Sequence, residues 1–157
     1  MSRQRQPIIG VIGGGRCSRD QQEKAAAVGR YVAQNGGVIV CGGLGGTMEG
    51  AARGAAEAGG KVIGIIPSDD RGDANEFVDY VIPTGLGEAR NLLVVRTADA
   101  IVAFPGAFGT LSEVAFALKI GKPVIAVGAW EQYERIVQFD DPLDAAREAL
   151  RLAKGHP

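Results

Sequence analysis

Short apolar runs rich in β-branched residues alternate along the chain with alanine-rich stretches that have the periodicity of amphipathic helices. Strands that alternate with helices are typical of βαβ units, in which successive strands lie parallel. The pattern predicts an α/β fold with one doubly wound, mostly parallel sheet of about six or seven strands and helices on both faces. The predicted strands are Ile8–Ile12, Val38–Cys41, Val62–Ile66, Val78–Ile82, Ala100–Phe104 and Val124–Val127.

Capping residues and glycines predict where the helices begin and end. Ser18 to Gln21 fits a capping box at the start of the first helix, which is expected to end at Gly36-Gly37. Asp141 as N-cap and Pro142 at the first helical position predict the start of the last helix. Five helices are predicted. The first begins after Ser18, the second spans Thr47–Ala58, the third spans Glu88–Thr97, the fourth begins at Thr110 and stops at Gly121, and the last extends from Pro142 through Leu150.

Two segments do not fit this alternation. The stretch Trp130–Phe139 has no clear period, and the Asp-rich loop Ser68–Glu76 is predicted to be a mobile flap over a site. A chain of 157 residues fits one domain, so residues 1–157 are predicted to form one domain with residues 1–6 as a flexible tail.

Charge and apolar content limit the partners that the chain is expected to have. Seventeen basic and eighteen acidic residues give a net charge of −1, so neither nucleic acid nor a membrane surface is an expected partner. The longest apolar runs are about five residues, far short of a bilayer span, and Met1–Gln6 is too polar for a signal peptide. These features predict a cytoplasmic protein.

Cysteine and histidine are too few to predict a disulfide framework or a metal site. The chain has two cysteines, Cys17 and Cys41, and one histidine, His156. Both cysteines follow predicted strands, where free buried or half-buried thiols are the usual interpretation in a cytosolic protein, and a redox role stays open.

Three glycine-rich turns follow predicted strands: Gly13–Gly15, Gly42–Thr47 and Pro105–Thr110. The second and third lead directly into helices, so their backbone N–H groups and the positive ends of the helix dipoles are expected to meet at the carboxyl edge of the sheet. Such a place attracts phosphate. The alternative is that the glycines only permit tight turns. The candidate ligand-binding residues are Gly13, Gly14, Gly42, Gly43, Gly45, Gly46, Thr47, Arg90, Asn91, Pro105, Gly106, Ala107, Phe108, Gly109 and Thr110.

Two common nucleotide-binding motifs are absent from the sequence. Gly10 to Gly15 lacks the G-x-G-x-x-G spacing, and no acidic residue follows the second strand to bind a ribose hydroxyl. No G-x-x-x-x-G-K-[ST] segment occurs either. An NAD-dependent dehydrogenase and an ATP or GTP hydrolase are therefore disfavoured.

Two charged residues next to these turns each have two interpretations. Arg90 is either a solvated surface arginine or a guanidinium that reaches a phosphate or ribose. Glu113 either completes a capping box with Thr110 or points its carboxylate at a ribose, where it would stabilise positive charge developing at the anomeric carbon. The spacing of the residues does not separate these interpretations.

Several spaced segments together resemble one superfamily. Pro105–Glu113 resembles the P-G-G-x-G-T-x-x-E signature of the LOG (LONELY GUY) phosphoribohydrolases, often mislabelled as lysine decarboxylases. Cys41–Gly50, Gly59–Pro67 and Gly87–Asn91 resemble more closely the sister group of short chains that includes the molybdenum cofactor carrier proteins. The resemblance covers about residues 8–128 and implies a Rossmann-like fold, a homodimer or homotetramer, and a phosphorylated small molecule at the glycine-rich turns.

The two groups imply different functions. The LOG pattern would make Glu113 and Arg90 a catalytic pair that hydrolyses the N-glycosidic bond of a cytokinin nucleoside 5'-monophosphate. Ala107 replaces a glycine of that signature, and Asn91 stands where LOG enzymes have lysine, whereas the carrier-like group has Arg-Asn. The first hypothesis is therefore a molybdopterin-binding carrier, and the phosphoribohydrolase is the alternative. Neither Lys61 nor Lys122 lies in a recognisable Schiff-base context, so lysine decarboxylation is disfavoured.

Overall fold

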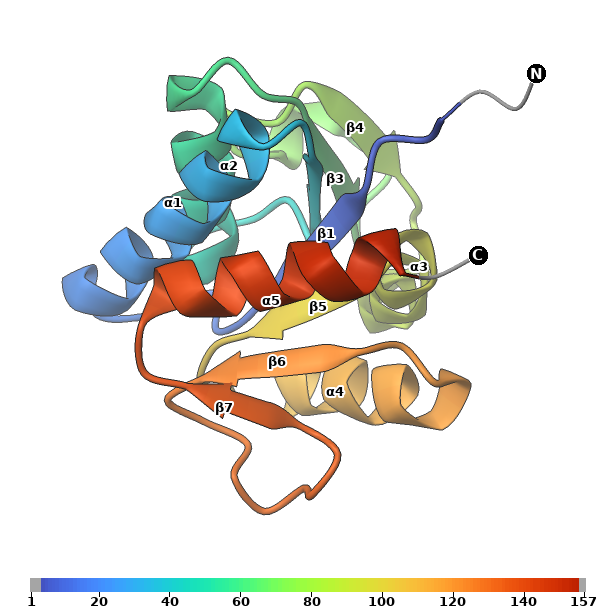
Figure 1. Ribbon diagram of the computed structural model, residues 1–157. Coiled ribbons are helices and arrows are strands. Elements are labelled where there is room, and N and C mark those ends of the chain that lie inside the picture. Colours follow the sequence, from blue (N-terminus) through green and yellow to red (C-terminus); the bar gives the residue numbers. More distant parts are fainter. Residues whose placement is uncertain (1–3, 156–157) are drawn as a thin grey trace.

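A computed structural model describes residues 4–155 of the chain, so His156 and part of the predicted tail lie outside the described residues. Seven strands form one sheet in the order β4-β3-β2-β1-β5-β6-β7, and every neighbouring pair is parallel. The structure confirms the predicted doubly wound α/β fold (Figure 1). The strands are β1 (Ile8–Ile12), β2 (Val38–Cys41), β3 (Val62–Ile66), β4 (Tyr80–Pro83), β5 (Ala100–Ala103), β6 (Val124–Val127) and β7 (Val137–Phe139).

Five α-helices cover the two faces of the sheet and enclose two apolar cores. In Figure 1, α1, α2 and α5 lie in front of the sheet, and α3 and α4 lie behind it. Successive strand residues point to opposite faces, so Val11 packs into the core under α1, α2 and α5, whereas Ile12 packs into the core under α3 and α4. The helices are α1 (Arg19–Gln34), α2 (Thr47–Glu57), α3 (Asn91–Thr97), α4 (Phe108–Ile120) and α5 (Pro142–Lys154).

Most predicted elements are present, with corrections at some of their ends. The predicted fourth strand is shifted to Tyr80–Pro83, and the segment without clear period contains β7. The predicted helix from Glu88 begins as a 3-10 turn, η2 (Gly87–Arg90), before α3. The last helix runs past Leu150 to Lys154, because Ala153 is also buried on its apolar face.

The prediction that Thr110 begins the fourth helix is wrong. The helix α4 begins at Phe108 with Ala107 as its N-cap, and no side chain caps it. Thr110 is the third residue of the helix and only 5% exposed, and its hydroxyl packs against Gly106. The predicted Ser18 and Asp141 caps are confirmed, since each side chain accepts a hydrogen bond from a first-turn amide.

The order of the strands places the site. From β1 to β4 successive strands are added toward one edge of the sheet, and from β5 to β7 they are added toward the other edge. The order therefore reverses between β1 and β5, which pair in the middle of the sheet. At such a switch point the loops that leave the two strands diverge and open a crevice at the carboxyl edge. Here those loops are Gly13–Gly15 and Pro105–Ala107. None of the helices within residues 4–155 has the length and apolar character needed to span a bilayer.

Candidate functional site

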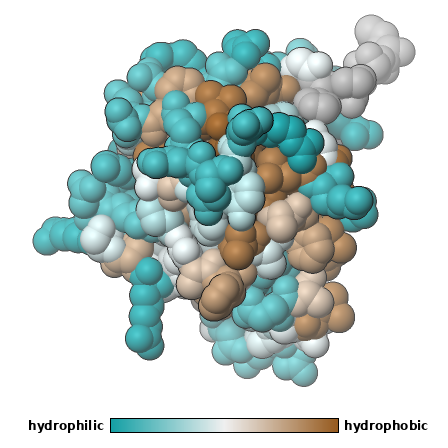
Figure 2. Space-filling view, turned by 90° about the horizontal axis from the view of Figure 1, so that it is seen from below, coloured by the Kyte–Doolittle hydropathy of each residue, from teal (hydrophilic) through white to brown (hydrophobic). Residues whose placement is uncertain are grey.

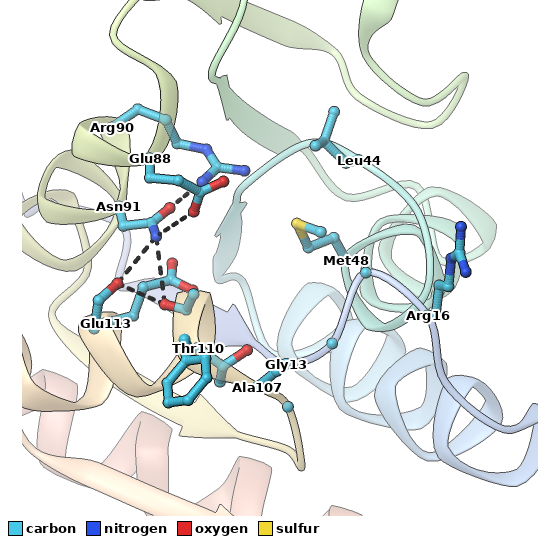
Figure 3. Close-up of a pocket in the computed structure, with 16 residues that line it drawn as sticks. Gly13, Arg16, Leu44, Met48, Glu88, Arg90, Asn91, Ala107, Thr110 and Glu113 are labelled. Carbon is cyan, nitrogen blue, oxygen red and sulfur yellow. Dashed lines mark hydrogen bonds between the residues drawn. The ribbon is translucent and has the colours of Figure 1, made fainter.

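A cavity of about 770 Å³ opens at this crevice. Four segments of the chain line it: the turn after β1, the start of α2, the turn before α3, and the loop that leads into α4 (Figure 3). The lining residues are Gly13, Gly14, Gly15, Arg16, Leu44, Met48, Glu88, Arg90, Asn91, Gly106, Ala107, Phe108, Gly109, Thr110, Ser112 and Glu113.

The three glycine-rich turns are joined by hydrogen bonds. Gly14 N donates to Pro105 O (3.0 Å), and Thr47 N donates to Gly14 O (3.0 Å). The side chain of Gln21, on α1, donates to both Thr47 Oγ1 (2.9 Å) and Pro105 O (3.0 Å). The turns therefore meet at one place, as the sequence predicts, but partly by bonding to one another.

The Gly42–Thr47 turn supports the cavity rather than lining it with its amides. Thr47 is fully buried, and its amide is used by Gly14 O. Gly46 has φ of +62°, and a side chain there would overlap the backbone of Gly14 and Gly15. Of this turn only Leu44 lines the cavity. Gly42, Gly43 and Gly45 of this turn, and Pro105 of the third turn, are also predicted ligand-binding residues that do not line the cavity.

The start of α4 presents free backbone donors to the cavity. Leu111 N bonds to Ala107 O (2.9 Å), which leaves the amides of Phe108, Gly109 and Thr110 as the open first turn of the helix. These N–H groups and the helix dipole favour an anion. Ala107, Phe108 and Gly109, predicted as ligand-binding residues, all line the cavity at this end.

Arg90 is not a surface arginine, because only 6% of it is exposed. Its Nε donates to Ile65 O (2.9 Å), its Nη2 to Gly42 O (3.4 Å), and its Nη1 to Asn91 Oδ1. These acceptors use three of the five N–H groups of a guanidinium. The others remain for a ligand in the cavity.

Asn91 links the two helices behind the cavity. Its Nδ2 lies within hydrogen-bond distance of Gly109 O (3.3 Å), Ser112 Oγ (3.1 Å) and Glu88 Oε2 (3.2 Å). Ser112 Oγ in turn donates to Gly109 O (2.6 Å). Because Asn91 also accepts from Arg90, it holds the guanidinium and the start of α4 in a fixed relation (Figure 3).

Glu113 is a buried carboxyl group at the cavity wall. It is only 8% exposed, and no group in residues 4–155 donates a hydrogen bond to its carboxyl oxygens. Since α4 begins at Phe108, Glu113 does not cap it, and the capping-box interpretation is wrong. Burial raises the pKa of Glu113 to about 8, against the opposing effect of Arg90, and nearby Glu88 raises it further. At neutral pH the carboxyl therefore holds a proton most of the time.

Sequence reasoning missed the wall on the other side of the cavity. Arg16, Leu44 and Met48 lie across from Arg90 and Asn91 in Figure 3. Arg16 is exposed and follows directly after Gly15, and this position after a glycine-rich turn is the one signal that could have indicated it. Leu44 and Met48 carry no such signal, because apolar residues are equally expected in a core.

Within residues 4–155, no three His, Cys, Asp or Glu side chains gather in a way that could hold a metal ion. Cys17 is half-buried, and Cys41 is buried at the end of β2. Burial raises the pKa of the Cys41 thiol to about 11, so the less nucleophilic thiol form persists at neutral pH.

The fold and this cavity define a doubly wound α/β protein with a ligand-sized cavity at the carboxyl edge of its sheet, and comparison with known proteins identifies the family. The model of the SLOG cluster4 family matches residues 6–151, and the chain belongs to this family. The structure is similar to that of the molybdenum cofactor binding protein from Rippkaea orientalis, with TM-score 0.88 and 36% identity over 94% of this chain and 96% of that one. It is also similar to the molybdenum cofactor carrier protein from Chlamydomonas reinhardtii, with TM-score 0.87 and 32% identity over 97% and 100% of the two chains.

Sequence relatives include an uncharacterized protein from Archaeoglobus fulgidus, 41% identical over 90% of this chain and 93% of the relative. The cytokinin riboside 5'-monophosphate phosphoribohydrolase of Mycobacterium tuberculosis is 33% identical over 71% of this chain, and the match spans 65% of that enzyme's length. The predicted relationship to both groups is confirmed, with the carrier proteins matched over more of the chain.

Proposed function

We propose that the protein binds a phosphorylated, nucleotide-like ligand, and that this ligand is molybdopterin or the molybdenum cofactor. The observation that carries the proposal is the meeting of the open first turn of α4 with the turn after β1 and the buried guanidinium of Arg90 at one cavity. Charge-assisted hydrogen bonds from such donors contribute about 1.5 to 3 kcal/mol each. Together they hold a phosphate without a lysine.

The rest of the cavity suits a ring system. Its volume of about 770 Å³ is in the range of sites for ligands of this size. Leu44 and Met48 give one wall an apolar surface for a planar ring, while Glu88 and Glu113 offer carboxyl groups to ring nitrogens. The structural similarity to proteins described as molybdenum cofactor binding and carrier proteins supports this choice of ligand.

Binding of molybdopterin under anaerobic conditions, followed by fluorescence or calorimetry, tests the carrier function. Arg90→Met should weaken binding at least about tenfold, because it removes a charged donor to the phosphate. Glu113→Gln should change affinity less than about threefold, because it replaces a mostly neutral carboxyl with a neutral amide. If phosphorylated pterins do not bind to the unaltered protein, the carrier function is wrong.

One observation favours a second candidate, a phosphoribohydrolase of nucleoside 5'-monophosphates. Glu113 lies beside Arg90 at the cavity and carries a pKa of about 8, in the range where a carboxyl group serves as a general acid near neutral pH. With the 5'-phosphate at α4, the proton of Glu113 would pass to the leaving base as the bond between its nitrogen and the anomeric carbon breaks. Water then adds to that carbon and gives a proton to the carboxylate of Glu113, which yields ribose 5-phosphate and restores the acid.

Incubation with AMP and isopentenyladenosine monophosphate, with free base measured by chromatography, distinguishes the two functions. An enzyme releases base, and Glu113→Gln lowers the rate at least about 100-fold while the affinity for nucleotide persists. A carrier releases none. The absence of base across a panel of nucleotides would reject the hydrolase.

We also propose that the protein forms a homodimer or homotetramer through α3 and α4. Phe108 is 86% exposed at the start of α4, and Leu93 and Phe116 are exposed on the same pair of helices. Large exposed apolar side chains on two neighbouring helices are typical of a subunit interface. Figure 2 shows brown, apolar groups among the polar ones on the face of the molecule that is seen from below the view of Figure 1.

A further inference from the structure

Gln21 is the residue that links the three glycine-rich turns, although it does not line the cavity. Its Nε2 uses both hydrogens, one to Thr47 Oγ1 and one to Pro105 O. With the bonds from Thr47 N to Gly14 O and from Gly14 N to Pro105 O, these contacts close a ring through all three turns. Sequence reasoning assigned Gln21 only to a capping box, but its side chain turns away from Ser18 to make these bonds.

The ring fixes the direction of two peptide groups. A trans peptide is planar, so its C=O and the following N–H point in opposite directions, and residues 4–155 contain no cis peptide. Pro105 O accepts from Gly14 N and Gln21, which turns the Gly106 N–H the other way. Gly14 O accepts from Thr47 N, which does the same for the Gly15 N–H.

Both of these amides lack an acceptor in the described structure, and both belong to glycines that line the cavity. The opposite orientation of the peptides would present carbonyl oxygens there, which repel an anion. An anion at the start of α4 would therefore gain donors or lose them according to how the ring holds these two peptides.

We infer that Gln21 is a positioning residue for the anion site: it fixes the Pro105–Gly106 and Gly14–Gly15 peptides so that their N–H groups bind an oxyanion. This inference rests on the proposed phosphate binding. It extends that function by naming the donors and the residue that aims them.

Gln22 offers a matched control on the same helix. Its Nε2 donates to Gly46 O (3.1 Å), a carbonyl that already accepts from Gly50 N and does not line the cavity. Gln21→Met and Gln22→Met therefore remove the same chemical group from adjacent positions. Only the first breaks the ring.

Sulfate is the probe, because it remains a dianion across the accessible pH range. In a titration of the wild-type protein followed by ¹H–¹⁵N NMR, the amide resonances of Gly15 and Gly106 should move on saturation. Gln21→Met should weaken sulfate binding roughly tenfold and reduce the shift at Gly106. Gln22→Met should remain within about twofold of wild type.

Gln21→Glu keeps the size of the side chain and tests the role of the donor. Its carboxylate offers no hydrogen to Pro105 O, whereas its protonated form offers one. Sulfate affinity relative to wild type should therefore recover as pH falls through the titration of the new carboxyl group. Taking the ratio to wild type removes the contribution of Glu113.

The outcomes separate this inference from the proposed function. Equal sulfate affinities of the two Met variants, or a wild-type titration that moves neither Gly15 nor Gly106, would overturn the role of Gln21 while binding itself stands. If the wild-type protein binds neither sulfate nor AMP, both the inference and the proposed phosphate site are wrong.

Discussion

Glu113 is a buried carboxyl group whose proton is bound more tightly in the folded protein than in the unfolded chain. Its pKa rises from 4.5 to about 8 on folding, chiefly because burial disfavours the charged form. The folded state therefore binds more protons than the unfolded state between these values, and the free energy of unfolding falls as pH rises from about 4.5 to 8. The slope approaches about 1.4 kcal/mol per pH unit.

The variant Glu113→Gln should remove this slope. Urea unfolding at several pH values between 5 and 8.5 measures it: wild type should lose stability with rising pH relative to the variant, and Glu113→Gln should be the more stable protein at pH 8.5. If the difference in the free energy of unfolding between wild type and Glu113→Gln does not change with pH, Glu113 is not a buried, protonated group.

For single residues, the sequence predicted which side chains lie together at the site, but not their burial or their hydrogen bonds. Arg90, Asn91 and Glu113 were all identified, and the structure brings them to one cavity wall. Position along the chain could not show that Arg90 is buried, because two of the oxygens that accept from it, Ile65 O and Gly42 O, belong to distant segments. Nor could the spacing of Thr110 and Glu113 exclude a capping box, since that depends on a helix start two residues earlier.

Among the elements, α1 and α2 pack unusually closely because glycines lie at their contact. A side chain at Gly54 would overlap the backbone of Ala26, and one at Gly29 would overlap that of Ala51. Two ion pairs, Arg30 with Glu57 and Arg53 with Glu23, close the edges of this contact. The packing matters to the site, since α1 carries Gln21 and α2 carries Met48.

Gly54→Ala therefore should destabilise the protein by about 1 to 3 kcal/mol through overpacking. In an open helix the same change would stabilise by about 1 kcal/mol, so the sign of the effect reports the contact. The exposed Ala56 on the same helix provides the control, where Ala56→Gly should cost about 1 kcal/mol by helix propensity alone. A stabilising Gly54→Ala in urea unfolding would show that the two helices do not touch there.

Elements with a strong apolar period were predictable from the sequence, and elements formed by contacts between distant segments were not. The buried strands β1, β2, β3 and β6 have the predicted bounds because each is a continuous apolar run. The edge strand β7 has two exposed residues out of three, so its sequence carries no such run. The predicted flap Ser68–Glu76 is attached to the second turn by Asn75, which bonds to Gly43 O and Leu44 O, contacts that no local pattern reveals.

For the whole molecule, the parallel strand order was enough to place the three turns at one edge, and this is why the candidate site could be found from sequence. The same reasoning could not reveal that the turns bond to one another, because hydrogen bonds between loops depend on their conformations and not on their order. As a result, several glycines predicted to bind the ligand, such as Gly45 and Gly46, lie behind the residues that line the cavity.

The exposed apolar residues on α3 and α4 predict that the protein assembles into a homodimer or homotetramer. Phe116, 37% exposed, lies on α4 and does not line the cavity, so a substitution there tests assembly without changing a residue of the cavity wall. Phe116→Lys should weaken self-association by at least about 2 kcal/mol, roughly thirtyfold in the dissociation constant, because a charge would be buried at the interface.

Sedimentation of the purified protein over a range of concentrations measures this effect. Leu143→Lys provides the control, since Leu143 is 42% exposed on α5, on the other face of the sheet. Wild type and Leu143→Lys should sediment alike as a dimer or tetramer, and Phe116→Lys should shift toward the monomer. A monomeric wild type, or equal dissociation of both variants, would place the exposed residues of α3 and α4 outside any interface between copies. Because Phe108 lies on the same helix and also lines the cavity, an interface there would cover one side of the ligand and couple its affinity to protein concentration.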